Sequence, residues 1–294
     1  MSVAYEQELE LYHYDESLCS QKARIGLCEK ALSYKSNVIM ICDINSDCQN
    51  LSPDYLNVNP KGIVPTLVHN GEPVYDAHRI VKYIDEQYPD SGIRLWPSDE
   101  QREEAARLWF DAAMLKEDVP FGTTFGTAIP AISMPLLAHC LQRQPLKVVE
   151  KNMAKHPLRS RAEVFVQMRK YGAKFPPGLL AMVLEQLCKG LLQVNQQLEE
   201  FGGPWLLGDF SISDVTMMAC FHRMQDVRLD DIFFEDALPQ LAAYWERLQA
   251  RPSYKEAVSD WHDEENIRSS LREVFGASRN PMLTETAKVL GSLA

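Results

Sequence analysis

The hydrophobic period of the chain changes between residues 8 and 32. Leu9 and Leu11 alternate with polar neighbours, which is the period-two pattern of a strand, and from Leu18 to Leu32 apolar residues recur at helical spacing. A strand over 8–14 therefore leads directly into a helix over 18–32. The start of such a helix offers unpaired N–H groups and the positive end of the dipole, and both favour an anion such as a thiolate. We expect this turn to hold a thiol, either the protein's own or a ligand's.

The next 60 residues extend this unit into a small α/β domain. A second strand is expected over 38–41, a loop with a short helix over 44–55, and a hairpin whose Asn70-Gly71 turn follows a strand over 66–68. Asp76 is a good N-cap for a helix that runs to about Gln87. The resulting order β-α-β-(α)-β-β-α implies a right-handed crossover between parallel strands. It predicts a thioredoxin-like fold.

Strand patterns are absent after residue 99, and amphipathic helical patterns replace them. A long helix is expected over 177–201, and the nearly continuous apolar run 215–224 predicts a buried one. The fold class is therefore a thioredoxin-like α/β N-terminal domain followed by an all-α C-terminal domain. The expected division is 1–89 for the first domain, 90–98 for a linker, 99–261 for the helical domain with a long insertion at about 120–178, and 262–294 for a peripheral tail.

Charge and cysteine usage exclude several classes of protein. A formal charge of −11 disfavours binding to nucleic acid or to an anionic membrane surface. No apolar run is long enough to span a bilayer, and the first residues lack the pattern of a secretory signal. Seven cysteines without a CxxC pair make zinc and disulfide interpretations weak. We expect a cytoplasmic protein without a metal site.

Four motifs in order resemble those of the cytosolic glutathione transferase superfamily. The run Ser17–Ile25 is similar to the Ser-Ser-Cys-x-x-x-x-Arg-Ile stretch of zeta-class members and to that of the tetrachlorohydroquinone reductive dehalogenases. Asn59–Pro65 resembles the family's cis-proline loop, Asp76-Ala77 its acidic-serine helix start, and Ser211–Asp214 its capping box. The enlarged helical domain is similar to that of bacterial β-etherases and of ganglioside-induced differentiation-associated proteins. The resemblance implies the fold named above, glutathione as cosubstrate and a homodimer.

The resemblance also implies which residues hold glutathione. Val64, before a cis Pro65 in the loop that contains Ile63, would pair its backbone with the cysteinyl residue of glutathione. Asp76 would hold the γ-glutamyl amino group. At Ala77 the family usually has a serine that binds the γ-glutamyl carboxylate, so one hydrogen bond is lost here, and His78 or Arg79 could compensate. Lys61 either neutralises the glycyl carboxylate or is a solvated turn lysine.

Two residues compete for the catalytic role. The hydroxyl of Ser17 could donate a hydrogen bond to the glutathione thiolate. Cys19, whose pKa the helix N-terminus should depress, could instead attack a glutathione adduct and form a mixed disulfide. A third interpretation is that neither is catalytic and that Cys19 is a small buried side chain.

The electrophile would lie between the first helix and the helical domain. Candidate residues of this pocket are aromatic: Tyr14, Trp109, Phe110, Phe121 and Phe125. The predicted function is thiolate attack on an apolar, aromatic small molecule, with ether cleavage, reductive dehalogenation and isomerisation as variants. The alternative is a binding or regulatory protein that has kept the fold with little or no catalysis.

Overall fold

A mixed sheet of four short strands forms the first part of the computed structural model, which describes residues 2–114, 119–176, 178–262, 267–276 and 280–294. The strand order is β2-β1-β3-β4, with β1 parallel to β2 and antiparallel to β3. The bounds of these strands are β1 Leu9–His13, β2 Lys35–Val38, β3 Thr66–His69 and β4 Glu72–Tyr75. The β3–β4 hairpin turns at Asn70-Gly71, as the sequence predicts.

The second strand lies three residues earlier than its apolar run predicts. β2 pairs Glu10 with Lys35 and His13 with Val38, so the polar segment Lys35–Asn37 forms the ladder. β2 is an edge strand with alternating half-buried and exposed residues, and such a strand needs little apolar surface. The apolar residues Met40 and Ile41 lie beyond the sheet and pack against the main core.

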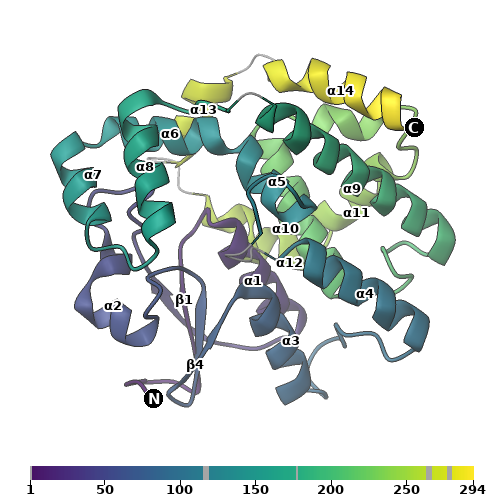
Figure 1. Cartoon of the computed structure of the whole chain (residues 1–294). Helices are drawn as coiled ribbons and strands as arrows, with labels where there is room; N and C mark the ends of the chain where they lie inside the picture. Colours follow the sequence, from purple (N-terminus) through teal and green to yellow (C-terminus); the bar gives the residue numbers. More distant parts are fainter. Residues whose placement is uncertain (1, 115–118, 177, 263–266, 277–279) are drawn as a thin grey trace.

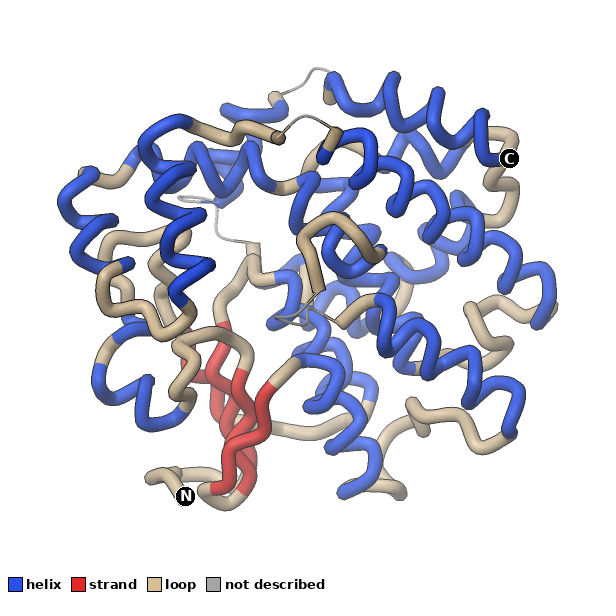
Figure 2. Tube along the Cα trace, viewed as in Figure 1, coloured by secondary structure: helices blue, strands red, loops and turns tan. Residues whose placement is uncertain are grey.

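Helices cover both faces of this sheet (Figures 1 and 2). Helices α1 and α3 lie on one face, where Leu11 and Leu67 of the sheet meet Leu27 and Ile80. Helix α2 lies on the other, where Tyr55 packs beside Val58 and Val68. The bounds are α1 Leu18–Glu29, η1 Gln49–Leu51, α2 Pro53–Val58 and α3 Ala77–Gln87. The predicted thioredoxin-like α/β domain is confirmed.

The rest of the described chain is helical, which confirms the predicted all-α part. Helix α10 lies at its centre, and all of its residues except Gln225 are buried. It packs against α1 and α3 as well as α4 and α11, so it joins the helical part to the sheet domain. The bounds are α4 Glu100–Ala112, α5 Phe125–Ile132, α6 Met134–Arg143, α7 Leu146–Met153, α8 Arg159–Tyr171, α9 Leu179–Phe201, α10 Ile212–Asp226, η2 Asp230–Phe234, α11 Leu241–Gln249, α12 Pro252–Ala257 and η3 Ser259–Trp261.

The segment with α6, α7 and α8 has a small core of its own. Its apolar side chains, among them Met134, Leu141 and Phe165, pack on the loop that precedes α2. In that loop Cys42 and Cys48 form a disulfide with a Cα–Cα distance of 4.2 Å. The sequence analysis disfavoured disulfides, and for this pair that expectation is wrong. The count and spacing of cysteines did not reveal it, because the turn over 43–47 and the packing of the α6–α8 segment bring the two residues together.

The last described helices, α13 Ser269–Phe275 and α14 Pro281–Leu293, pack on the helical domain (Figure 1, yellow). Helix α14 lies along α9 and α13 lies against α6. Leu271 and Leu290 are buried in the main core, so the described part of the tail is structural rather than peripheral. In the described ranges we find no helix long and apolar enough to cross a membrane.

Candidate functional site

Ser17 caps α1 at the edge of the sheet where β1 ends. Its Oγ accepts a hydrogen bond from the Ser20 N–H at 3.3 Å, and Ser20 Oγ in turn accepts from the Tyr14 N–H at 3.2 Å. Ser17 is half-buried and has extended backbone torsions, as an N-cap residue does. Because Oγ serves the helix as an acceptor, the Ser17 hydroxyl keeps its own hydrogen for another partner.

Cys19 lies inside the first turn of the same helix. Burial raises the pKa of the Cys19 thiol, and the nearby Lys22 cation offsets this only in part. The expectation of a depressed pKa is therefore wrong, because desolvation of the thiolate outweighs the favourable charges around it. Cys19 is a thiol at neutral pH, although the residue is partly exposed.

The loop before β3 contains the predicted cis peptide bond between Val64 and Pro65. Asn59 Nδ2 and the Tyr55 hydroxyl both donate to the Ile63 carbonyl, at 2.9 Å and 2.6 Å. Among the described residues, none pairs with the backbone N–H or C=O of the half-buried Val64. This backbone is available to an extended ligand in the manner of an added strand.

Asp76 begins α3 with a φ of 72°. Its carboxylate accepts from the N–H groups of His78 and Arg79 at 3.0 Å and 3.3 Å, so it caps the helix as predicted. Ala77 is buried directly beside this cap, and Lys61 is exposed near the start of the cis-proline loop.

His78 points away from the start of α3 and into the interface with the helical domain. Its Nε2 lies 3.1 Å from Thr216 Oγ1, and its ring contacts Phe110 edge-on at 5.5 Å. Burial, reinforced by the Lys22 cation, holds the pKa of His78 well below its usual range. A neutral imidazole bonded to Thr216 supplies no charge for a carboxylate, so the structure contradicts the suggestion that His78 compensates for Ala77.

The predicted pocket aromatics divide into core and surface. Trp109 and Phe125 are buried and pack edge-to-face at 5.7 Å, with the Trp109 indole donating to Gln197 Oε1. Tyr14 is likewise buried, whereas Phe110 is half-buried and Phe121 is 42% exposed. Only Phe110 and Phe121 present appreciable surface, because Tyr14, Trp109 and Phe125 belong to the main hydrophobic core.

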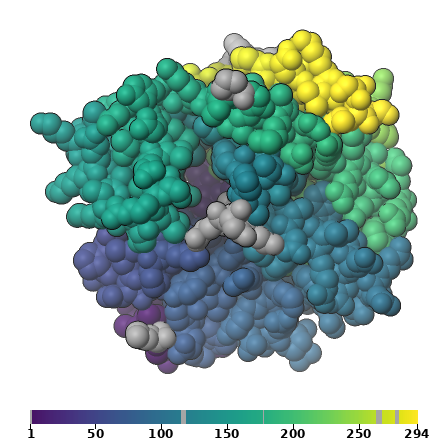
Figure 3. Space-filling view, in the orientation of Figure 1, coloured from purple at the N-terminus to yellow at the C-terminus, as the bar shows by residue number. Residues whose placement is uncertain are grey.

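A hollow opens on the face shown in Figure 3 between the α6–α8 segment and the region of α5. Purple N-terminal residues form its floor. The β1–α1 turn belongs to this part of the chain, and the colouring of Figure 1 places the start of α1 there. The turn that the sequence singles out is thus approached through a recess beside the insertion.

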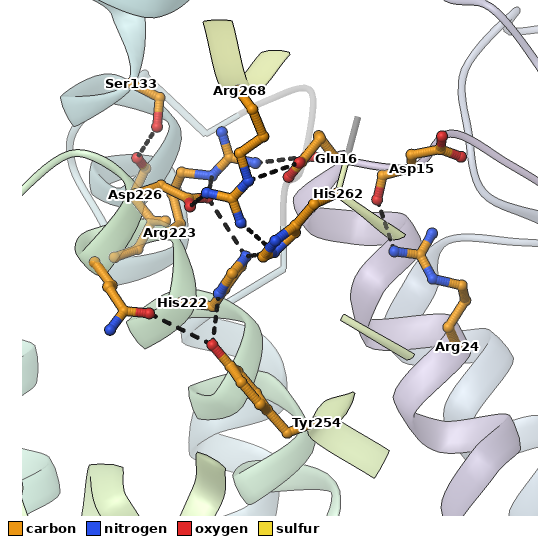
Figure 4. A network of polar contacts seen from close by, with 12 residues as sticks. Asp15, Glu16, Arg24, Ser133, His222, Arg223, Asp226, Tyr254, His262 and Arg268 are labelled. Carbon is orange, nitrogen blue, oxygen red and sulfur yellow. Dashed lines mark hydrogen bonds and ion pairs between the residues drawn. The ribbon is translucent and has the colours of Figure 1, made fainter. Parts of the chain in front are cut away.

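Sequence reasoning missed a buried polar network behind this turn (Figure 4). The Glu16 carboxylate lies 3.5 Å from Arg268 Nε, and Arg268 Nη1 donates to Asp226 Oδ1 at 2.7 Å. His222 Nε2 lies 3.5 Å from Asp226 Oδ2 and 3.4 Å from His262 Nε2. Burial and the Asp226 charge raise the pKa of Glu16 to about 7. These residues come from three distant segments, so no local pattern could reveal them.

Glu16, His222 and His262 could offer ligand atoms to a metal, since three such atoms lie within 4.8 Å of one another. The guanidinium of Arg268 contacts Glu16, His262 and the neighbouring Asp226. With Arg223 also beside Asp226, two cations balance two carboxylates. The donor set fits a protein cation better than a metal ion.

Family models match the two parts of this fold in the expected places. Residues 11–92 match the glutathione S-transferase N-terminal domain, and residues 179–259 match its C-terminal domain, together more than half of the chain.

Individual proteins resemble the chain over most of its length. The tetrachloro-p-hydroquinone reductive dehalogenase of Sphingobium chlorophenolicum is 27% identical over 85% of this chain and 95% of its own. The human ganglioside-induced differentiation-associated protein 1-like 1 is 24% identical over 87% of this chain and 75% of its own. The solved β-etherase LigF from Sphingobium sp. strain SYK-6 superposes with a TM-score of 0.71, at 20% identity, over 85% of this chain and 98% of its own. The chain belongs to the glutathione S-transferase family, whose enzymes use glutathione as cosubstrate.

Proposed function

We propose that this protein activates glutathione at the start of α1 and directs the thiolate at an apolar, aromatic electrophile. The observation that carries the proposal is the hydrogen bonding of the Ser17 hydroxyl. Its Oγ accepts from the Ser20 N–H, which leaves the hydroxyl hydrogen to donate to a thiolate. Such a donor, together with the first N–H groups of α1, lowers the pKa of a bound thiol.

The remaining contacts to glutathione follow from the open backbone and the two helix starts. Val64 pairs its N–H and C=O with the cysteinyl residue, Asp76 holds the γ-glutamyl amino group, and Lys61 faces the glycyl carboxylate. Ile63 and Pro65 shape the loop, with the Ile63 carbonyl already held by Asn59 and Tyr55. The electrophile enters through the hollow, with Phe110 and Phe121 as its aromatic contacts.

A reductive variant gives Cys19 a separate task. The glutathione thiolate first displaces halide from the ring. Cys19, once deprotonated, then attacks the glutathione sulfur, so that the carbon–sulfur bond breaks, the ring carbon takes a proton, and a mixed disulfide forms. A second glutathione releases Cys19 as glutathione disulfide forms. The similarity to a reductive dehalogenase supports this variant, whereas the raised pKa of Cys19 favours simple transfer through Ser17.

Calorimetric titration with glutathione, followed by turnover of a halogenated hydroquinone, an aryl ether and a cis-enone, tests the proposal. We expect saturable binding and activity with at least one of the first two substrates. Absence of binding and of thermal stabilisation at millimolar glutathione would contradict it. That result would support the second candidate, a binding protein with the same fold, for which Ala77 in place of a hydroxyl residue is the favouring observation.

Two further expectations belong to the same proposal. We infer a homodimer, which sedimentation of the purified chain checks, and a cytoplasmic location, which cell fractionation checks. The disulfide between Cys42 and Cys48 argues in the opposite direction for the compartment.

A further inference from the structure

Lys22 in the second turn of α1 is a buried lysine whose ammonium group has no ion-pair or hydrogen-bond partner among the described residues. The residue is 2% exposed. Lys30, at the end of the same helix, shows what a buried lysine ordinarily needs. It is paired with Asp85 at 2.9 Å. A charge that is largely removed from water is costly without a counter-charge, so Lys22 offers an anion a site that no described residue occupies.

The packing of α1 on α3 places Lys22 beside Ala77. Strands β1 and β4 run in the same direction, since both are antiparallel to β3, and each is followed directly by its helix. The two helices therefore start at the same edge of the sheet and run side by side (Figure 1). A Cβ on Gly26 would lie 2.7 Å from Val81 Cγ2, which makes Gly26 and Val81 direct neighbours. One turn earlier on both helices, Lys22 comes opposite Ala77.

The electrostatic interactions of Lys22 agree with this alignment of α1 and α3. Lys22 acts electrostatically on Cys19 in its own helix and on His78 in the first turn of α3, and Asp76 acts on Cys19 as well. His78 stays neutral and bonded to Thr216, so it does not compete for an anion. Asp76 engages the N–H groups of His78 and Arg79 with its carboxylate. None of the described residues pairs with the N–H of Ala77 or with the ammonium of Lys22, so both are available to a ligand at the start of α3.

We propose that Lys22 binds the carboxylate of the γ-glutamyl residue of glutathione at the start of α3. The inference rests on the proposed function. It explains how a site with alanine at position 77 holds this carboxylate, because an ammonium replaces the missing hydroxyl donor. It also gives a role to a buried lysine of α1 that none of the described residues pairs with.

The test is a thermodynamic cycle that combines one substitution in the protein with the removal of one carboxylate from the ligand. Dissociation constants of the full chain and of Lys22→Met are measured by calorimetry for glutathione and for γ-aminobutyryl-cysteinyl-glycine, which lacks the carboxylate. We expect Lys22→Met to weaken glutathione about tenfold or more and to leave the truncated ligand within about twofold. Lys22→Arg should keep most of the affinity, and Ala77→Ser added to Lys22→Met should restore part of it.

Matched controls separate this inference from a loss of folding. Lys189→Met removes an exposed lysine from α9 and should change neither constant. The ligand-free Lys22→Met protein should melt no lower than the parent, because a buried unpaired charge is removed. Unchanged glutathione affinity in Lys22→Met, or equal losses for both ligands, would overturn the inference alone. Failure of the parent chain to bind glutathione would instead overturn the proposed function.

Discussion

At the scale of single residues, Ser17 and Cys19 are separated by two positions in one helical turn, yet their surroundings give them different chemistry. The Ser17 hydroxyl accepts from the Ser20 N–H and so keeps its own hydrogen for a ligand, whereas the Cys19 thiol is desolvated. A hydroxyl donor needs no ionisation to act, whereas a thiol nucleophile does. At neutral pH this favours Ser17 as the group that contacts the bound thiolate.

Replacing Ser17 with alanine should therefore raise the pKa of bound glutathione and reduce kcat/KM. A lost hydrogen bond to a charged acceptor corresponds to about 1.5–3 kcal/mol, or roughly tenfold to 150-fold. The ultraviolet absorbance of the thiolate as a function of pH measures the first effect, and steady-state turnover the second. Cys19→Ser is the matched variant, and it should matter only for reductive dehalogenation. Equal activity of both variants with every substrate would reject both assignments.

Glu16 predicts a pH dependence of folding. Its pKa rises from 4.5 to about 7 in the folded protein, so the folded state binds the proton more tightly than the unfolded chain does. The stability that Glu16 contributes is present below about pH 4.5 and is lost as pH rises through about 7. The melting temperature of Glu16→Gln relative to the parent should therefore increase between pH 5 and pH 8. Glu8→Gln, at an exposed position, should leave the pH dependence unchanged.

At the scale of elements, hydrogen bonds at the start of α10 connect several parts of the helical domain. The buried Asp214 carboxylate accepts from the N–H groups of Leu206 and Ser211, both at 2.9 Å, and from the Tyr244 hydroxyl at 2.7 Å. It therefore does more than complete the capping box, since it also ties the preceding loop and α11 to the helix.

Asp214→Ala should lower the free energy of unfolding by at least about 2 kcal/mol, because several buried donors lose their acceptor. Chemical denaturation measures this. Asp209→Ala in the same loop is the control, since the Asp209 side chain is 92% exposed and its ion pair with Arg102 spans 3.4 Å. We expect that variant to stay within about 0.5 kcal/mol of the parent. Similar losses in both would show that the loop, rather than the carboxylate network, limits stability.

At the scale of the whole molecule, the segments after α12 complete both the core and the site. Arg268 reaches Glu16 next to the Ser17 cap, and α14 covers α9 with Leu290 buried at 1% exposure. The hollow is bounded on its other side by the α6–α8 segment (Figure 3). Residues far apart in the chain therefore determine the surroundings of one short turn.

The role of α14 in the core can be tested with two leucines three residues apart. Leu290→Ala should cost about 2–5 kcal/mol of unfolding free energy, as for other buried leucines. Leu293→Ala should cost far less, since Leu293 is 37% exposed. Thermal or denaturant unfolding of the two variants compares them directly. Equal and small effects would mean that α14 contributes little to the stability of the main core.

The local patterns of the sequence determined the strand-to-helix turn at Ser17, the proline loop at Val64-Pro65, the Asp76 cap and the capping box at Ser211. Each depends on neighbours within a few residues, so its pattern could be read directly. Tertiary structure decided the register of β2, the burial of Trp109 and Phe125, the inward turn of His78, and the disulfide between Cys42 and Cys48. It also decided that Lys22 is buried with no ion-pair partner among the described residues. Those features depend on which distant segments pack together, and on the balance between desolvation and charge that the packing creates.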